Sequence, residues 1–134
     1  MKPVFLEFCG INSFSEPAKV DFEKLLEFGI FGIFGDTGSG KSTILDCIGF
    51  ALYGNVARSR SGSIAEIIHY SAEKAYVHFV FEIVFEGSRR TFRVERELKR
   101  KNAAQTLKVF EKKEDRFLVL ADSVREGNAL LERI

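Results

Sequence analysis

The chain has 134 residues, of which 46% are hydrophobic and 29% charged, and its formal net charge is +1 at pH 7. These values are typical of one globular domain at most, and they exclude a low-complexity chain or one divided by a linker. No signal peptide or membrane span is predicted, so no membrane partner is expected. Cys9 and Cys47 lie in apolar surroundings and are expected to be reduced core residues, which favours a cytoplasmic protein.

The first 34 residues predict three strands. Apolar and polar side chains alternate weakly over residues 3–9 and cleanly over residues 19–23, as they do in half-buried strands. Residues 28–34 form an apolar run without a charge, which is typical of a strand buried on both faces of a sheet. This third strand leads directly into the most informative motif of the chain.

Residues 35–42 read Gly-Asp-Thr-Gly-Ser-Gly-Lys-Ser and match the phosphate-loop pattern G-x-x-x-x-G-K-[ST] at every fixed position. Glycines at those positions let backbone N–H groups point at phosphate oxygens. We expect Lys41 to place its charge on the β- and γ-phosphates and the Ser42 hydroxyl to bind Mg²⁺. The predicted nucleotide-binding residues are Gly35, Asp36, Thr37, Gly38, Ser39, Gly40, Lys41, Ser42 and Thr43.

A helix is predicted directly after this loop, which completes the strand, loop and helix order that a phosphate loop requires. Apolar residues recur at spacings of one, three and four, and Gly54 is placed to end the helix. The strand, loop and helix would form a P-loop unit within about residues 25–55. The predicted inward face consists of Ile44, Leu45, Ile48, Ala51 and Leu52.

The rest of the chain predicts two antiparallel strand pairs and a final helix. Both pairs together would form an antiparallel β-subdomain over about residues 74–121. The predicted elements are a helical turn at 64–69, a hairpin of 77–85 and 91–98 with its turn at 86–88, strands at 106–111 and 116–120 with a turn at 111–115, and a helix over about 123–134.

The apolar run that ends in Asp122 has the form of the second nucleoside-triphosphatase motif, whose aspartate holds Mg²⁺. It follows the charged turn at 111–115 directly. We therefore interpret it as the return arm of an antiparallel hairpin, with Asp122 as a helix N-cap. The chain also offers no catalytic base that can be recognised from sequence, so no catalytic residue is predicted in it.

Basic residues gather between residues 89 and 101. Seven Lys or Arg side chains there face only two acidic residues, Glu95 and Glu97. Such an excess could track a nucleic-acid backbone. It could equally be the solvated face of a strand with cross-strand ion pairs.

Residues 32–54, which include the phosphate loop, strongly resemble the amino-terminal segment of the SbcC family of SMC-like DNA-repair ATPases. Further similarity lies outside this segment, so that the resemblance covers essentially the whole chain. It involves residues 1–3, Phe14, residues 20–22 and residues 119–122.

Two positions depart from the pattern of this family. Asp36 stands where the family usually has proline, which changes the charge and stiffness of the phosphate loop. Asn12 stands where many relatives place an arginine, ahead of a serine that corresponds to Ser13. Contacts from Asn12 and Ser13 to the nucleotide base and ribose are therefore the weaker part of the prediction.

The resemblance implies an α/β fold: a P-loop NTPase domain that is the amino-terminal lobe, residues 1–134, of an ABC/SMC-type head. It implies that ATP and Mg²⁺ bind between two heads, with the signature sequence and second acidic motif supplied by a carboxy-terminal lobe. The implied partners are that lobe, a second copy of the head, an SbcD-type nuclease subunit and double-stranded DNA, whose ends and hairpins the complex would process. The isolated chain is expected to lack significant turnover.

Other functional classes remain as alternatives. The chain could belong to the nucleotide-binding domain of another ABC-type ATPase, or it could be a noncatalytic nucleic-acid-binding module that uses residues 89–101. A small P-loop kinase would need a phosphoacceptor site and a mobile arginine lid. A GTPase would need a base-reading N-K-x-D segment, which the sequence lacks.

Overall fold

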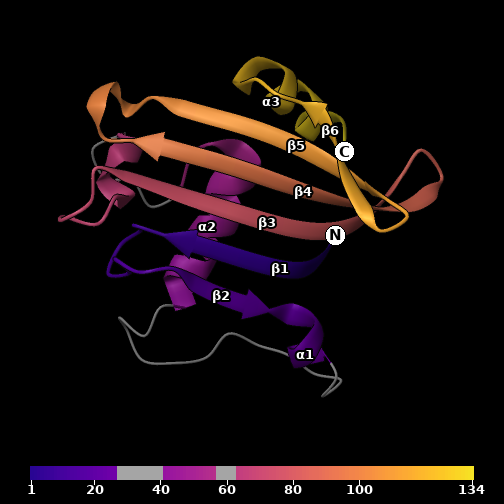
Figure 1. The fold of residues 1–134 in the computed structure, drawn as a ribbon, viewed down its shortest axis with the longest axis horizontal. Helices are drawn as coiled ribbons and strands as arrows, with labels where there is room; N and C mark the ends of the chain where they lie inside the picture. Colours follow the sequence, from indigo (N-terminus) through magenta and orange to yellow (C-terminus); the bar gives the residue numbers. More distant parts are fainter. Residues whose placement is uncertain (27–40, 57–62) are drawn as a thin grey trace.

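A computed structural model describes residues 1–26, 41–56 and 63–134 of the chain (Figure 1). The strand predicted at 28–34 lies outside these residues. The described strands are β1 (Lys2–Cys9), β2 (Ala18–Asp21), β3 (Lys74–Phe85), β4 (Ser88–Lys99), β5 (Gln105–Lys113) and β6 (Arg116–Ala121). The described helices are α1 (Phe22–Leu26), α2 (Lys41–Tyr53) and α3 (Val124–Arg133), with short 3₁₀ turns at Ile64–Ile67 and Lys101–Ala103.

The described strands form a single sheet in the order β2-β1-β3-β4-β5-β6, and every neighbouring pair is antiparallel. Both strand pairs predicted within 74–121 are present. The sheet does not stop at that boundary, because β1 pairs with β3 from Lys2 opposite Glu82 to Cys9 opposite Tyr76. Helices α2 and α3 pack against the sheet and against each other (Figure 1), in agreement with the predicted α/β class.

Two-residue turns close both hairpins, so the turns are shorter than the sequence predicted. In the first hairpin, Glu86 and Gly87 have positive φ values of 53° and 82°. Positive φ at both central residues is the pattern of a type I′ turn, whose twist matches that of the flanking strands. In the second hairpin, Glu114 has a φ of 57° and Lys113 pairs with Arg116.

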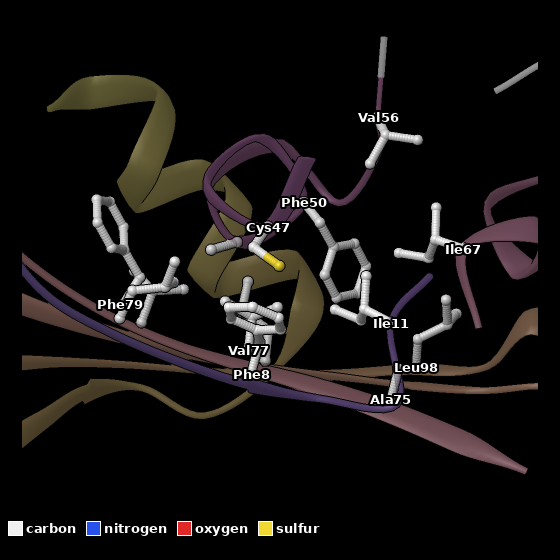
Figure 2. Packing of buried hydrophobic residues seen from close by; sticks show 14 of the residues in the cluster. Phe8, Ile11, Cys47, Phe50, Val56, Ile67, Ala75, Val77, Phe79 and Leu98 are labelled. Carbon is white, nitrogen blue, oxygen red and sulfur yellow. The ribbon is translucent and has the colours of Figure 1, made fainter. Parts of the chain in front are cut away.

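Alternation along β3 determines which of its side chains enter the core. Ala75, Val77, Phe79 and Phe81 are buried, while the residues between them are partly exposed, as expected from the two-residue period of a strand. Figure 2 shows Val77 and Phe79 standing on the sheet below α2. Each fully buried Phe side chain contributes about 1.5–3 kcal/mol of transfer free energy.

Helix α2 has the predicted limits but turns a different face to the sheet. Cys47, Phe50 and Ala51 are fully buried, whereas Leu45 is 60% exposed; Figure 2 shows Cys47 and Phe50 in the core. The prediction that Leu45 faces inward was therefore wrong. Apolar residues lie on most sides of α2, so their spacing alone does not define the inward direction, and contact with the sheet selects it.

The second predicted strand is shorter than expected. Strand β2 ends at Asp21, and the Asp21 Oδ1 atom accepts hydrogen bonds from the backbone N–H groups of Glu23 (3.1 Å) and Lys24 (3.3 Å). An aspartate in this position stabilises the first turn of a helix. Residues after Asp21 therefore begin α1 instead of continuing the strand.

The N-cap of α3 is Ser123 and not Asp122. The Ser123 hydroxyl accepts a hydrogen bond from the backbone N–H of Glu126 at 3.2 Å, and Ser123 has extended backbone angles, as an N-cap residue should. Asp122 lies one residue earlier, where its Oδ1 is 4.0 Å from the Lys108 Nζ. The assignment of Asp122 as the cap was therefore wrong by one position.

Strand β6 is the return arm of a hairpin with β5, as the sequence predicted, and it lies at one end of the sheet order. Among the described strands, none pairs with its second edge. Three of its apolar side chains remain 44–56% exposed: Leu118, Val119 and Leu120.

Candidate functional site

Most of the predicted nucleotide site lies outside the described residues. This applies to the backbone of Gly35–Gly40 and to the side chains of Lys41 and Ser42. The backbone of α2 is described from Lys41 onward, so the helix begins at the lysine of the octet. Thr43 is the first residue of the predicted set with a described side chain, and it is 5% exposed.

The start of α2 suits an anionic ligand. The first N–H groups of a helix have no partner within the helix, and the aligned peptide dipoles place partial positive charge there. No acidic residue occupies the first turn of α2, so none of the side chains in that turn carries a charge that would repel an anion. The residues predicted to bind phosphate and Mg²⁺ are next to this end of α2 in sequence. The partial positive charge of the helix end suits the phosphates that they would hold.

Asn12 is brought to the same end of α2 from the turn that follows β1. Its Nδ2 group donates to the Thr43 Oγ1 at 3.0 Å and to the Asp46 Oδ2 at 3.4 Å. Its backbone N–H donates to the Ile67 carbonyl at 2.7 Å, and its φ is 51°, a left-handed conformation that asparagine tolerates better than most residues. The Asn12 amide therefore holds this turn against the first two turns of α2.

Ser13 occupies the same turn but is exposed. Reciprocal backbone hydrogen bonds of 3.1 and 2.9 Å between Ile11 and Phe14 close the turn around it. The structure thus places Asn12 beside the start of α2, with Ser13 next to it in the same turn. Their contact with a base or ribose remains a prediction.

The far end of α2 contacts a charged residue for which the sequence predicted no individual role. Arg96 is 1% exposed, and burial lowers its pKa to about 10, so it stays charged at neutral pH. Its Nε donates to the Ala51 carbonyl in the last turn of α2 at 3.1 Å. The signal was present in the sequence, because Arg96 occupies the inward-facing register of β4 between Val94 and Leu98.

Four of the seven basic residues between 89 and 101 contact acidic, aromatic or neutral polar groups of the same chain. Arg90 pairs with Glu111, and the Arg93 guanidinium lies 4.3 Å from the ring centroid of Phe110. Arg100 donates to backbone carbonyls 2.9–3.1 Å away, and Arg96 is the buried residue described above. The interpretation as cross-strand ion pairs therefore accounts for Arg90. Arg93 pairs instead with Glu95 of its own strand at 2.9 Å, and Arg96 and Arg100 bind neutral oxygens.

The other three basic residues of the stretch, Arg89, Lys99 and Lys101, are exposed. In the part of the chain that the structure describes, none of the three forms an ion pair. They are the residues of the stretch whose charge remains accessible to a partner.

Two further properties bear on the class of site. None of the described helices is long and apolar enough to cross a membrane. Across residues 1–26, 41–56 and 63–134, no group of three or more His, Cys, Asp or Glu side chains is placed to hold a metal ion. The predicted metal ligand, the hydroxyl of Ser42, is not one of these residue types, and its side chain lies outside the described part of the chain.

A phosphate-loop octet that runs into α2, with an antiparallel sheet packed on that helix, defines a nucleotide-binding P-loop domain of the α/β class. The chain belongs to the AAA domain family, whose model matches residues 6–128. Membership of this family is consistent with the prediction that the chain binds a nucleotide.

Curated relatives extend the comparison along the full chain. The SbcC protein of the nuclease SbcCD from Bacillus subtilis is 38% identical over 137 residues, which cover 100% of this chain and 12% of that protein. The corresponding SbcC protein of Clostridium acetobutylicum is 37% identical over 139 residues, covering 100% of the chain and 12% of the relative. The predicted resemblance to SbcC is thereby confirmed.

A third relative carries a different name. "Probable DNA double-strand break repair Rad50 ATPase" of Aquifex aeolicus is 34% identical over 96 residues, covering 72% of this chain and 9% of that protein. The chain therefore spans about an eighth or less of the length of each of these three relatives.

Proposed function

We propose that this chain is the ATP-binding, amino-terminal lobe of an SMC-like DNA-repair ATPase that acts with an SbcD-type nuclease subunit. One observation carries the proposal: α2 begins at Lys41, the lysine of a complete phosphate-loop octet, in a chain that aligns from end to end with SbcC proteins of the nuclease SbcCD. The fold class within this proposal is that of an ABC/SMC-type head lobe.

Within the proposed site, the backbone of Gly35–Gly40 and the Lys41 side chain would hold the ATP phosphates, and the Ser42 hydroxyl would hold Mg²⁺. The Mg²⁺ ion, when bound, would supply charge stabilisation at the phosphates. The start of α2 adds its helix dipole to this attraction. Asn12 keeps the neighbouring turn in place through Thr43 and Asp46.

The proposal assigns hydrolysis to a composite site. Phosphoryl transfer needs a residue that positions the attacking water as well as a phosphate cradle, and the sequence offers no such residue in these 134. A carboxy-terminal lobe and a second copy of the head would complete the site, and double-stranded DNA and the nuclease would be the partners of the whole protein. Arg89, Lys99 and Lys101 are the residues of the basic stretch available to a DNA phosphate backbone.

Equilibrium binding and steady-state turnover of the 134-residue chain test this proposal. Weak, Mg²⁺-dependent ATP binding without turnover is expected, because the chain would provide only one side of the site. Restoration of hydrolysis on adding the missing lobe would support the composite site. Micromolar affinity together with appreciable turnover by the chain alone would contradict it.

A further inference from the structure

Arg96 connects three elements through one guanidinium group. Its Nε donates to the Ala51 carbonyl of α2 at 3.1 Å, its NH1 to the Gln105 Oε1 of β5 at 3.1 Å, and its NH2 to the Asn128 Oδ1 of α3 at 2.9 Å. Ring contact adds to these bonds, since the guanidinium carbon lies 5.8 Å from the ring centroid of Phe50. One rigid, planar side chain therefore bridges α2, β5 and α3.

All three acceptors are neutral, which is unusual for a buried positive charge. Within residues 1–26, 41–56 and 63–134, no carboxylate forms an ion pair with Arg96. The C-terminal end of α2 supplies the compensating partial negative charge, because the Ala51 carbonyl belongs to its last turn. The charge of Arg96 is thus tied to the orientation of α2.

The last turn of α2 is also held from outside the helix. The Gly54 N–H donates to the Phe50 carbonyl at 2.8 Å, and the Gly54 carbonyl accepts from the Gln105 Nε2 at 3.1 Å. Gln105 therefore binds both Gly54 and Arg96. This closed set of bonds leaves the C-terminal end of α2 little freedom to move without Arg96.

We propose that Arg96 is a positioning residue that joins α2 and α3 into one unit, so that phosphate binding at the start of α2 is coupled to the order of α3. This inference rests on the proposed nucleotide-binding function. A ligand bound at the start of α2 reduces the motion of that helix. Because Arg96 binds both Ala51 of α2 and Asn128 of α3, the motion of α3 is reduced as well. Asn128 is the arm of the bridge that can be removed while the bonds to Ala51 and Gln105 remain.

Hydrogen exchange of the chain, with and without Mg²⁺-ATP, tests the coupling at the amides of α3. In the wild type, saturating Mg²⁺-ATP should slow exchange in α3 by about fivefold or more, the lower end of typical coupling between sites. Asn128→Leu should abolish this ATP-dependent difference, while Asn128→Asp, which keeps an acceptor for Arg96, should retain it. Arg125→Ala, an exposed change on α3, is the matched control and should behave like the wild type.

A merely structural role would change exchange in the free chain but leave its response to ATP intact. Arg96→Lys keeps the positive charge but lacks the several N–H donors of the guanidinium, so it should also lose the ATP-dependent protection of α3. This variant replaces Asn128→Leu in the test if Asn128→Leu unfolds. Absence of ATP binding to the wild type would overturn the proposed function and this inference together. Normal ATP binding without protection of α3, or with the same protection in Asn128→Leu, would overturn the inference alone.

Discussion

Arg90 and Glu111 form a two-point ion pair between β4 and β5. The Arg90 Nε lies 2.6 Å from the Glu111 Oε1 and the Arg90 NH2 lies 2.7 Å from the Glu111 Oε2, while the Glu111 side chain is only 3% exposed. Lys113 adds a contact of 3.1 Å to the same carboxylate. The planar fork of an arginine matches a carboxylate in this way and fixes its orientation.

This ion pair should make stability depend on acid pH. Hydrogen bonding to Arg90 lowers the Glu111 pKa from its ordinary value of 4.5 to about 2. A carboxyl group with a lowered pKa stabilises the fold fully above its ordinary pKa, and this stabilisation is lost as the pH falls from about 4.5 to about 2. Denaturation of the wild type and Glu111→Gln across this range should show the two free energies of unfolding converging.

At neutral pH, Glu111→Gln should cost about 2 kcal/mol, because charge-assisted bonds to a buried group are lost. Glu82→Gln is the control: Glu82 lies 3.9 Å from Lys2 in a more exposed pair, and exposed pairs contribute about 0–1 kcal/mol. Equal losses of unfolding free energy in the two variants would show that burial does not strengthen the Arg90–Glu111 pair.

Gly54→Ala should destabilise the chain by more than the usual cost of a glycine replacement. Gly54 has a φ of 72°, and a Cβ atom there would lie 2.9 Å from the Arg96 NH1 and 3.1 Å from the Gln105 Oε1. Gly87→Ala is matched in backbone conformation, with a φ of 82°, but its Cβ would meet no described atom within 4 Å. The Gly87 variant should lose about 1 kcal/mol from backbone strain and the Gly54 variant more, as measured by chemical denaturation.

Two glycines inside helices should respond to alanine in opposite directions. Gly49→Ala in α2 should stabilise by about 0.5–1 kcal/mol, since among the described residues its Cβ would meet only the Asn55 carbonyl oxygen, at 3.7 Å. Gly127→Ala in α3 should destabilise, because its Cβ would overlap the Leu107 side chain, whose Cγ lies 2.7 Å away.

Melting temperatures of both alanine variants, together with the double variant Gly127→Ala, Leu107→Ala, check this pair of predictions. The Leu107 truncation should make room for the new methyl group, so the effect of Gly127→Ala should shrink or reverse in that background. Destabilisation by Gly127→Ala of the same size in both backgrounds would show that contact with Leu107 is not its cause.

Lys41→Ala should abolish binding that depends on the nucleotide phosphates, since the lysine is predicted to provide their main side-chain charge. Titration with ATP and with adenosine separates phosphate-dependent binding from base binding. Lys24→Ala removes an exposed lysine outside the octet and should leave both titrations unchanged. Retention of ATP binding by the Lys41 variant would refute the role assigned to this lysine.

Strand and helix positions were predictable where alternation or turn chemistry acts locally. Val77, Phe79 and Phe81 share a buried face because a strand reverses its side chains at every residue, and Gly54 ends α2 with a positive φ. Leu45 was misplaced because α2 is apolar on most sides, so only packing against the sheet selects the inward face. The cap was misplaced because Asp122 and Ser123 are both good N-cap residues in sequence.

The candidate site was predictable from its octet, but the residues that hold α2 in place were not. Asn12 is 31 residues from Thr43 in the chain, and their 3.0 Å contact depends on the turn after β1 reaching α2. Arg96 is 45 residues from Ala51, and its role depends on its facing inward from β4. Long-range contacts of this kind follow from tertiary packing, which local sequence patterns do not encode.

The outer edge of β6 has a practical consequence for work with this chain in solution. No described strand pairs with this edge, and Leu118, Val119 and Leu120 are exposed beside it. A strand edge of this kind is a template for pairing with another molecule. The charged run at 112–116 precedes these residues, and charged residues that flank an apolar strand oppose such pairing. Association through this edge should therefore depend on protein concentration, and dilution should keep the chain monodisperse.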